Sequence, residues 1–113
     1  MANRKIHLYK DYFKVFYAEQ TAAVRKKIAQ TITLVQQADR IPSSVFKSIE
    51  GAKGLFEIRV EFASNIYRIF CCFDEGQLVV LFNGFQKKSQ KTPQYVINIA
   101  LRLMKEYFDD KNK

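Results

Sequence analysis

Apolar and polar residues follow two different periods in the first third of the chain. Residues 4–10 alternate weakly, which predicts a short strand. From Asp11, which we expect to cap a helix, apolar positions recur every three or four residues. A second, clearer amphipathic helix is predicted from Thr21 to Ala38, with Thr21 as its cap. The apolar stripe of this second helix consists of Val24, Ile28, Ile32 and Val35.

A loop rich in Pro, Ser and Gly then leads to three strand-like segments. Residues 39–54 predict this loop, with one helical turn at 43–49. Strands are predicted at Leu55 to Phe62, Asn65 to Phe73 and Gln77 to Phe85, and their short connections indicate an antiparallel meander. Period two gives the first of these strands one charged face, which carries Glu57, Arg59 and Glu61.

The end of the chain predicts a basic loop and a C-terminal helix. Residues 86–92 are polar and basic, and we expect Thr92 to cap the helix with Pro93 in its first turn. Apolar residues cover two neighbouring sides of this helix, more than one sheet contact needs, which leaves part of it for a partner. Together the elements predict one α+β domain over residues 1–113: a small antiparallel-meander sheet with an N-terminal helical hairpin on one face and a C-terminal helix.

The composition is typical of a small cytoplasmic domain. A chain of 113 residues with 48% hydrophobic content can form a core without disulfides or metal. Cys71 and Cys72 are adjacent within an apolar run and lack metal-site spacing, so we expect two buried free thiols in a reducing cytosol. The sequence starts without an apolar signal segment, and no stretch approaches the ~18 residues of a membrane span. We expect no membrane, metal or small-molecule cofactor.

The net charge of the chain indicates which class of partner it binds. Nineteen Lys and Arg residues against eleven Asp and Glu give a formal net charge of +8. An excess of this size on a small surface creates a positive potential that favours polyanions such as RNA or DNA. A charged surface that serves solubility alone is the competing interpretation.

Two strand arginines are the first candidates for a site. Arg68 interrupts the apolar run of the second meander strand, and a half-buried arginine is costly unless it is paired or functional. An ion pair with Glu57 or Glu61 across the hairpin explains Arg68 equally well. Arg59 projects from the polar face of the first meander strand. His7, the one histidine, is interpreted as structural.

The basic segment after the third strand is a candidate phosphate-binding site. Lys87, Lys88 and Lys91 closely follow Phe85, an arrangement suited to a single-stranded RNA backbone and a stacked base. A solvated loop is the competing interpretation. Further RNA-binding candidates come from the loop before the meander: Lys47 and Lys53.

These cations suffice in principle for RNA cleavage, because the 2′-hydroxyl is an internal nucleophile. The enzyme has to align the attack, neutralise charge on the phosphate and assist proton transfer. Arg59 and Arg68 are candidates for neutralisation, since a guanidinium fork matches phosphate oxygens. Lys87 and Lys88 are candidates for proton transfer. We therefore predict these four residues as the catalytic group.

Three motifs together carry a family resemblance: E-x-R within LFEIRVEF, Y-R-I-F in the next strand, and L-x-x-G-F-x-K-K-x-x-K-T-P before the last helix. Over residues 55–107 the chain resembles the phage Gp49-like branch of HigB toxins in the RelE/ParE superfamily. The resemblance implies a RelE-like fold and metal-independent cleavage of messenger RNA in the ribosomal A site by 2′-hydroxyl attack. It also implies a type II toxin–antitoxin pair, with a HigA-like helix-turn-helix antitoxin as partner.

The resemblance also implies roles for single residues. Arg59 and Arg68 match strand arginines that hold phosphate, and Phe85 stands where an aromatic ring stacks on a base. The basic loop of the family is matched by Lys87, Lys88 and Lys91. Some relatives carry a catalytic His or Tyr near the C-terminal end; here Tyr107 lies in an apolar stripe, which predicts core packing.

Two other functions fit the same sequence. A ParE-like inhibitor of DNA gyrase shares the fold and binds a protein target, and fold does not determine function. A non-catalytic module that binds nucleic acid or a partner is the second alternative. The basic segment favours RNA over the gyrase interpretation.

Overall fold

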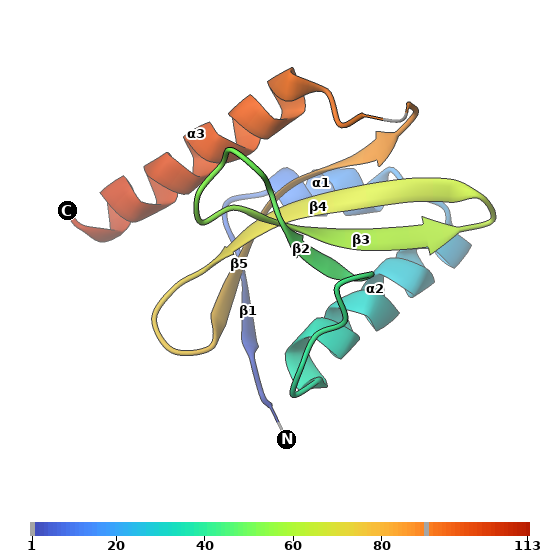
Figure 1. Ribbon diagram of the computed structural model, residues 1–113, viewed down its shortest axis with the longest axis horizontal. Coiled ribbons are helices and arrows are strands. Elements are labelled where there is room, and N and C mark those ends of the chain that lie inside the picture. The colour runs from blue at the N-terminus through green and yellow to red at the C-terminus, as the bar shows by residue number, and fades with distance from the viewer. Residues whose placement is uncertain (1, 90) are drawn as a thin grey trace.

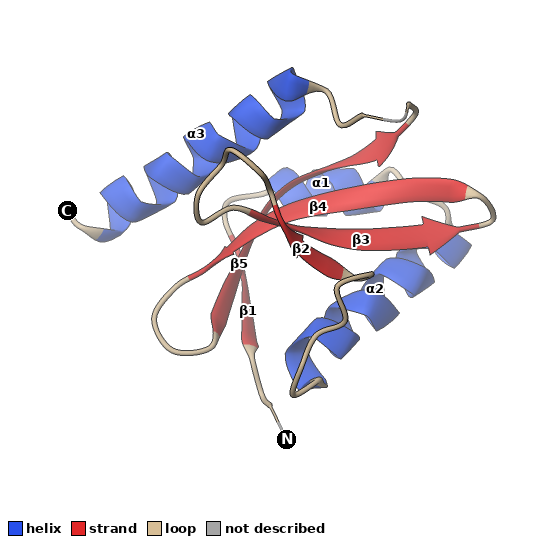
Figure 2. Ribbon diagram, in the orientation of Figure 1, coloured by secondary structure: helices blue, strands red, loops and turns tan. Residues whose placement is uncertain are grey.

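A five-stranded sheet separates an N-terminal pair of helices from a C-terminal helix (Figures 1 and 2). The computed structural model describes residues 2–89 and 91–113, so Met1 and Gln90, the latter within the predicted basic loop, lie outside the described residues. The α+β class predicted from the sequence is confirmed. In chain order the elements are β1 (Lys5–Leu8), α1 (Tyr12–Ala18), α2 (Ala22–Gln37), β2 (Phe46–Ser48), β3 (Phe56–Phe62), β4 (Asn65–Phe73), β5 (Leu78–Lys87) and α3 (Gln94–Lys111).

The strand order is β1-β5-β4-β3-β2. Strands β3, β4 and β5 form the predicted antiparallel meander, while β1 joins β5 in parallel and makes the sheet mixed. The helical turn predicted at 43–49 is confined to its first residues, where the Phe46 N–H donates a hydrogen bond to the Pro42 carbonyl oxygen at 3.0 Å. The rest of that prediction is wrong, because Phe46–Ser48 pair with β3 as strand β2. Phe46 also stacks on Phe56 with 5.0 Å between ring centroids. A strand partner distant in sequence thus overrides the local turn signal.

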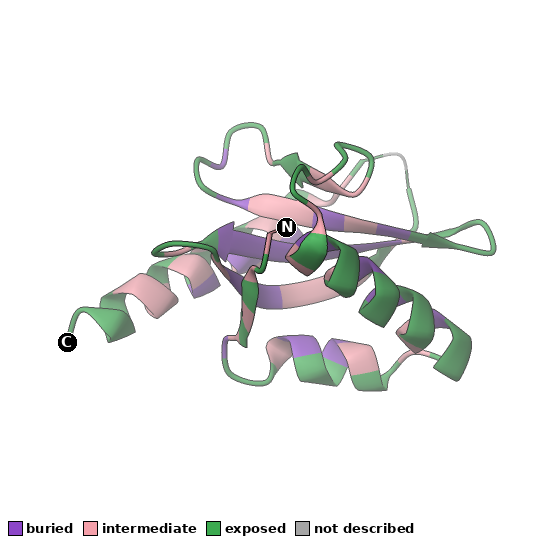
Figure 3. Ribbon diagram, turned by 90° about the horizontal axis from the view of Figure 1, so that it is seen from below, coloured by how far each residue is buried: buried purple, intermediate pink, exposed green. Residues whose placement is uncertain are grey.

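Helices α1 and α2 cover one face of the sheet, and their buried sides point toward it (Figure 3). Ile28 and Val35 of α2 are fully buried in this core together with Ile58 of β3. Thr21 caps α2 as predicted, since its hydroxyl oxygen accepts a hydrogen bond from the Val24 N–H at 3.3 Å. Asp11 directly precedes α1, as predicted, but its side chain makes no capping hydrogen bond, and its ψ of 10° is not the extended backbone of a capping residue.

Helix α3 covers part of the opposite face. Its buried residues Val96, Ala100 and Leu103 belong to a second core with Phe70 and Phe82. The same core also includes residues of the 49–55 segment. The second apolar side of α3 is half-buried against this core and consists of Ile97, Leu101, Met104 and Phe108. The prediction of Thr92 as the cap of this helix is wrong by one residue. Pro93, whose ψ of 136° is extended, directly precedes the first helical residue.

The adjacent cysteines are buried free thiols, as predicted. Cys71 belongs to the core under α1 and α2, and Cys72 to the core under α3, because neighbouring strand residues point to opposite faces. Burial raises the pKa of Cys72 to about 12. Among the residues that the structure describes, no helix is long and apolar enough to cross a membrane.

Candidate nucleic-acid interface

Charged side chains cross the sheet in register on the same face as α3, in the part of that face that the helix leaves open. Lys47 of β2 lies opposite Glu57 of β3, Arg59 opposite Arg68 of β4, and Lys87 of β5 opposite Ile66 of β4. Residues directly opposite on neighbouring strands share a face. Period two along β3 then adds Glu57 to the face of Arg59. Four strands therefore place charged groups on one surface.

These side chains surround one cavity of about 250 Å³, which we call the cationic cavity. Strands β2 to β5, the segment after β2 and the start of α3 all contribute to its lining. The predicted residues Lys47, Arg59, Arg68 and Lys87 all take part. Its full lining is Lys47, Ser48, Ile49, Glu50, Glu57, Arg59, Arg68, Lys87, Thr92 and Ile97.

Arg68 is the deepest cation of the cationic cavity, with 2% of the residue exposed. Its Nε lies 2.5 Å from Oε2 of Glu57 in an ion pair that lacks hydrogen-bond geometry, and its Nη1 donates a hydrogen bond to the Tyr67 carbonyl oxygen at 3.2 Å. Burial lowers the pKa of Arg68 below its usual value, and the Glu57 carboxylate opposes that shift. Of the two ion-pair partners open from the sequence, the structure selects Glu57.

The remaining cations of the cavity are more accessible and less compensated. Arg59 keeps 31% of its side chain exposed, and its Nε lies 3.8 Å from the same Glu57 oxygen that faces Arg68. Within the described part of the chain, Lys47 and Lys87 make no ion pair. Four cations thus face two carboxylates, Glu50 and Glu57, and the surplus positive charge suits a phosphate.

The other predicted residues lie around the cavity. Strand β5 extends to Lys87, so this lysine belongs to the sheet and not to the predicted loop. Lys88 lines a neighbouring cavity of about 370 Å³ with Lys87. Phe85 is half-buried and stacks on Phe70 with 5.7 Å between ring centroids, which leaves part of it for contact. Besides Lys88, two further candidates are exposed and do not belong to the cationic lining: Lys53 and Lys91.

Sequence reasoning treated Glu57 as no more than a partner for Arg68. The structure shows it in the lining of the cationic cavity, 14% exposed and ion-paired with two guanidinium groups. The signal was present in the E-x-R motif, because residues two apart on a strand share a face. Thr92 and Ile97 were also missed as lining residues, since no local pattern reports how the start of α3 packs over β5.

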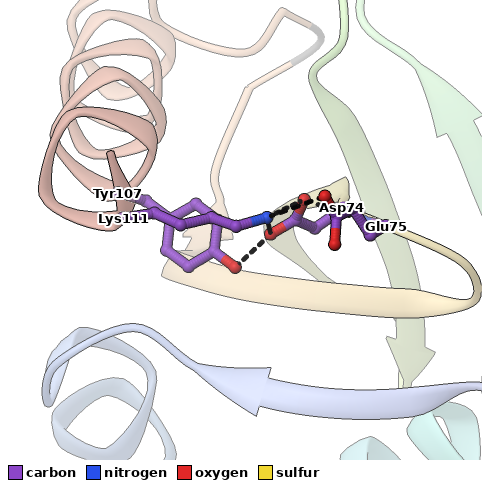
Figure 4. A network of polar contacts seen from close by, with 4 residues as sticks. All are labelled: Asp74, Glu75, Tyr107 and Lys111. Atoms are coloured by element: carbon purple, nitrogen blue, oxygen red, sulfur yellow. Dashed lines mark hydrogen bonds and ion pairs between the residues drawn. The ribbon is translucent and has the colours of Figure 1, made fainter. Parts of the chain in front are cut away.

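A second polar cluster joins the last turns of α3 to the β4–β5 connection (Figure 4). In this Asp74 network, defined by Asp74, Glu75, Tyr107 and Lys111, the Tyr107 hydroxyl donates a hydrogen bond to Asp74. Lys111 Nζ lies 2.8 and 2.9 Å from the two Asp74 carboxylate oxygens. Tyr107 follows Ile97 by ten residues, roughly 15 Å along a helix. Tyr107 is therefore a packing and hydrogen-bonding residue outside the cationic cavity.

Hydrogen bonds and burial in the Asp74 network shift two pKa values. The hydrogen bonds from Lys111 and Tyr107 lower the pKa of Asp74 to about 2. Burial, followed by the bond to Asp74, raises the pKa of Tyr107 to about 12. The network borders a cavity of about 660 Å³ in which two lysines, Lys5 and Lys111, balance two carboxylates. No group of three potential metal ligands occurs among the described His, Cys, Asp and Glu residues.

The sequence matches the model of one known protein family. Residues 16–105 match the model of the family described as Phage derived protein Gp49-like (DUF891). The match runs from Phe16 in α1 well into α3 and contains every residue of the cationic cavity. The family is toxin-like and related to RelE and HigB, and no curated protein matches the chain. Since the family model spans well over half of the sequence, this chain belongs to the Gp49-like family of phage-derived, toxin-like proteins.

Proposed function

We propose that this protein is the toxin of a type II toxin–antitoxin pair and that it cleaves messenger RNA on the ribosome. Membership of the Gp49-like family supports a toxin with an antitoxin partner. The observation that carries the nuclease proposal is the cationic cavity, where Lys47, Arg59, Arg68 and Lys87 outnumber the carboxylates. A HigA-like antitoxin would be the partner that silences the toxin.

In the proposed reaction the RNA 2′-oxygen attacks the adjacent phosphorus, and the bond from phosphorus to the 5′-oxygen breaks. The products are a 2′,3′-cyclic phosphate and a free 5′-hydroxyl. Arg59, Lys87 and Lys47 would hold the phosphate, because they are the accessible cations of the cavity. Arg68 is more buried and would position Glu57 through their ion pair.

Proton transfer needs one acceptor and one donor in the cavity. Glu57, as a carboxylate within the lining, would accept the 2′-hydroxyl proton. Lys87 would donate a proton to the departing 5′-oxygen, with Lys88 next to it in the adjoining cavity. Half-buried Phe85 would stack on a neighbouring base, and exposed Lys53 and Lys91 would contact the RNA backbone outside the cavity.

A translating cell extract tests this proposal. We expect the protein to cut the messenger while ribosomes occupy it and to leave 2′,3′-cyclic phosphate ends, which end-mapping detects. Arg59→Gln should abolish cutting, whereas Lys14→Gln, an equal charge change on α1, should not. A DNA supercoiling assay covers the ParE-like alternative: inhibition of gyrase with intact messenger would overturn the proposal. RNA binding without cutting would support a non-catalytic module.

A further inference from the structure

Strand β3 has an outer edge that β2 covers only in part. The pairing of β2 ends at Phe46, opposite Ile58, and one further backbone bond joins the Arg59 N–H to the Val45 carbonyl oxygen at 2.7 Å. Backbone groups alternate sides along a strand, so the next residue after Arg59 whose N–H and C=O point outward is Glu61. No backbone group in the described residues pairs with them. In Figure 1, β3 continues to its arrowhead beyond the part shared with β2.

A groove of about 320 Å³ lies beside this edge, between β3 and α2. Its apolar part includes Leu34, which is 39% exposed on α2, and Val45. Lys27 and Arg59 provide two positive charges in its lining, against one carboxylate from Glu61. We call this surface the edge groove. It combines an unpaired strand edge, an exposed apolar side chain and a net positive charge.

We propose that the edge groove binds an extended, acidic segment of a partner protein by strand addition to β3. The backbone of the segment would pair with the N–H and C=O of Glu61. Side chains at alternate positions of an added strand point to one face, so an apolar one would cover Leu34 while a carboxylate reaches Lys27 or Arg59. Such an occupant satisfies the backbone edge, the apolar surface and the charge together.

An RNA strand fits the edge groove less well. Phosphodiester oxygens accept hydrogen bonds but cannot donate one to the Glu61 carbonyl. Leu34 presents an aliphatic surface and not the aromatic ring on which a base stacks. A peptide strand supplies both a donor and an acceptor at every second residue, which favours a protein over a nucleic acid.

Arg59 connects the edge groove to the cationic cavity, because it lines both. A partner carboxylate that pairs with Arg59 would remove one of the accessible cations that we assign to phosphate. Docking at the edge would then weaken RNA binding. This consequence rests on the proposed function, whereas strand addition itself does not.

Glu61→Pro tests the proposal, with Glu61→Gln as the matched control. Proline removes the outward N–H and is tolerated at an edge strand, and the bonds to β4 come from Val60 and Phe62, not from Glu61. The probe is a short peptide of alternating valine and glutamate, with binding measured by calorimetry. We expect Glu61→Pro to weaken binding about tenfold or more, the effect of one lost hydrogen bond, and Glu61→Gln to leave it nearly unchanged. Equal affinities of the two variants would overturn the proposal.

Amide hydrogen exchange on the unmodified protein gives a second reading that does not depend on how the proline variant folds. The peptide should slow exchange at the Glu61 amide, and a peptide of alternating valine and lysine should not. An oligouridine serves as the nucleic-acid probe. Protection of Glu61 by oligouridine, with none from the acidic peptide, would show that the edge groove binds RNA and would overturn the proposal. Neither measurement requires RNA cleavage, so the two proposals can fail separately.

Discussion

The cationic cavity and the Asp74 network lie toward opposite ends of α3 and differ in how far their charges are compensated. In the cationic cavity one carboxylate, Glu57, faces two guanidinium groups, and two lysines remain unpaired among the described residues. In the Asp74 network one carboxylate accepts hydrogen bonds from Tyr107 and Lys111. The first cluster has positive charge to spare, whereas the second is satisfied within the protein.

The difference shows how a small basic domain separates binding from stability. Uncompensated cations repel one another and lower stability, but they create the potential that attracts a polyanion. A satisfied cluster offers little to a ligand and instead holds α3 on the β4–β5 connection. Variants should therefore divide into those that change RNA chemistry and those that change folding, with Glu57 affecting both.

The largest effect is expected from Glu57→Gln, which leaves the buried Arg68 without its counter-charge. We expect a loss of about 3 kcal/mol in the free energy of unfolding, because an unpaired buried charge is costly. Arg68→Met should cost less, about 1 kcal/mol, since Glu57 retains Arg59 at 3.8 Å. Urea denaturation measures both. Equal losses would mean that leaving Arg68 without its counter-charge costs no more than removing Arg68.

Lys87→Gln should lower the rate of messenger cleavage about 100-fold, the effect of removing one donor from a charge-stabilising site. Its unfolding curve should stay close to that of the unmodified protein, since Lys87 makes no ion pair with described residues. Initial rates in a translating extract give the first value and circular dichroism the second. A variant that loses stability but not activity would reverse the contrast between the two clusters.

Asp74→Asn should show the opposite profile, with unchanged cleavage and a loss of about 1 kcal/mol in unfolding free energy at neutral pH. The pKa of Asp74 is lowered to about 2, so the carboxylate contributes stability above its unfolded value near 4, and this contribution disappears as the pH falls through 2. Urea curves at pH 7, 4 and 2 should therefore converge for the two proteins at the lowest pH. A constant difference across this range would exclude ionisation as its cause.

The smallest effect is expected from Lys111→Gln in the same network. Lys111 keeps 37% of its side chain exposed, and exposed ion pairs contribute little. Asp74 also retains the Tyr107 hydrogen bond. Thermal unfolding should change less than for Asp74→Asn. A larger change would mean that the lysine, and not the tyrosine, holds α3 in place.

Local pattern determined most of the secondary structure. Apolar spacing located α1, α2 and the three meander strands, and short connections fixed their antiparallel order. Period two put Glu57 and Arg59 on one face, and the motifs pointed to the Gp49-like family. These features depend on neighbours within a few residues, which is the range that side-chain periodicity reports.

Tertiary structure decided which distant groups meet. The parallel pairing of β1 with β5, the formation of β2 and the approach of Ile97 to the cationic cavity all join segments far apart in sequence. From the register, Glu57 and Glu61 are equivalent diagonal neighbours of Arg68, and packing alone selected Glu57 and left Glu61 on the open edge. Periodicity fixes the face on which a side chain lies, but only the packed sheet and helices fix its partners, because contacts between distant segments form when whole surfaces are buried together.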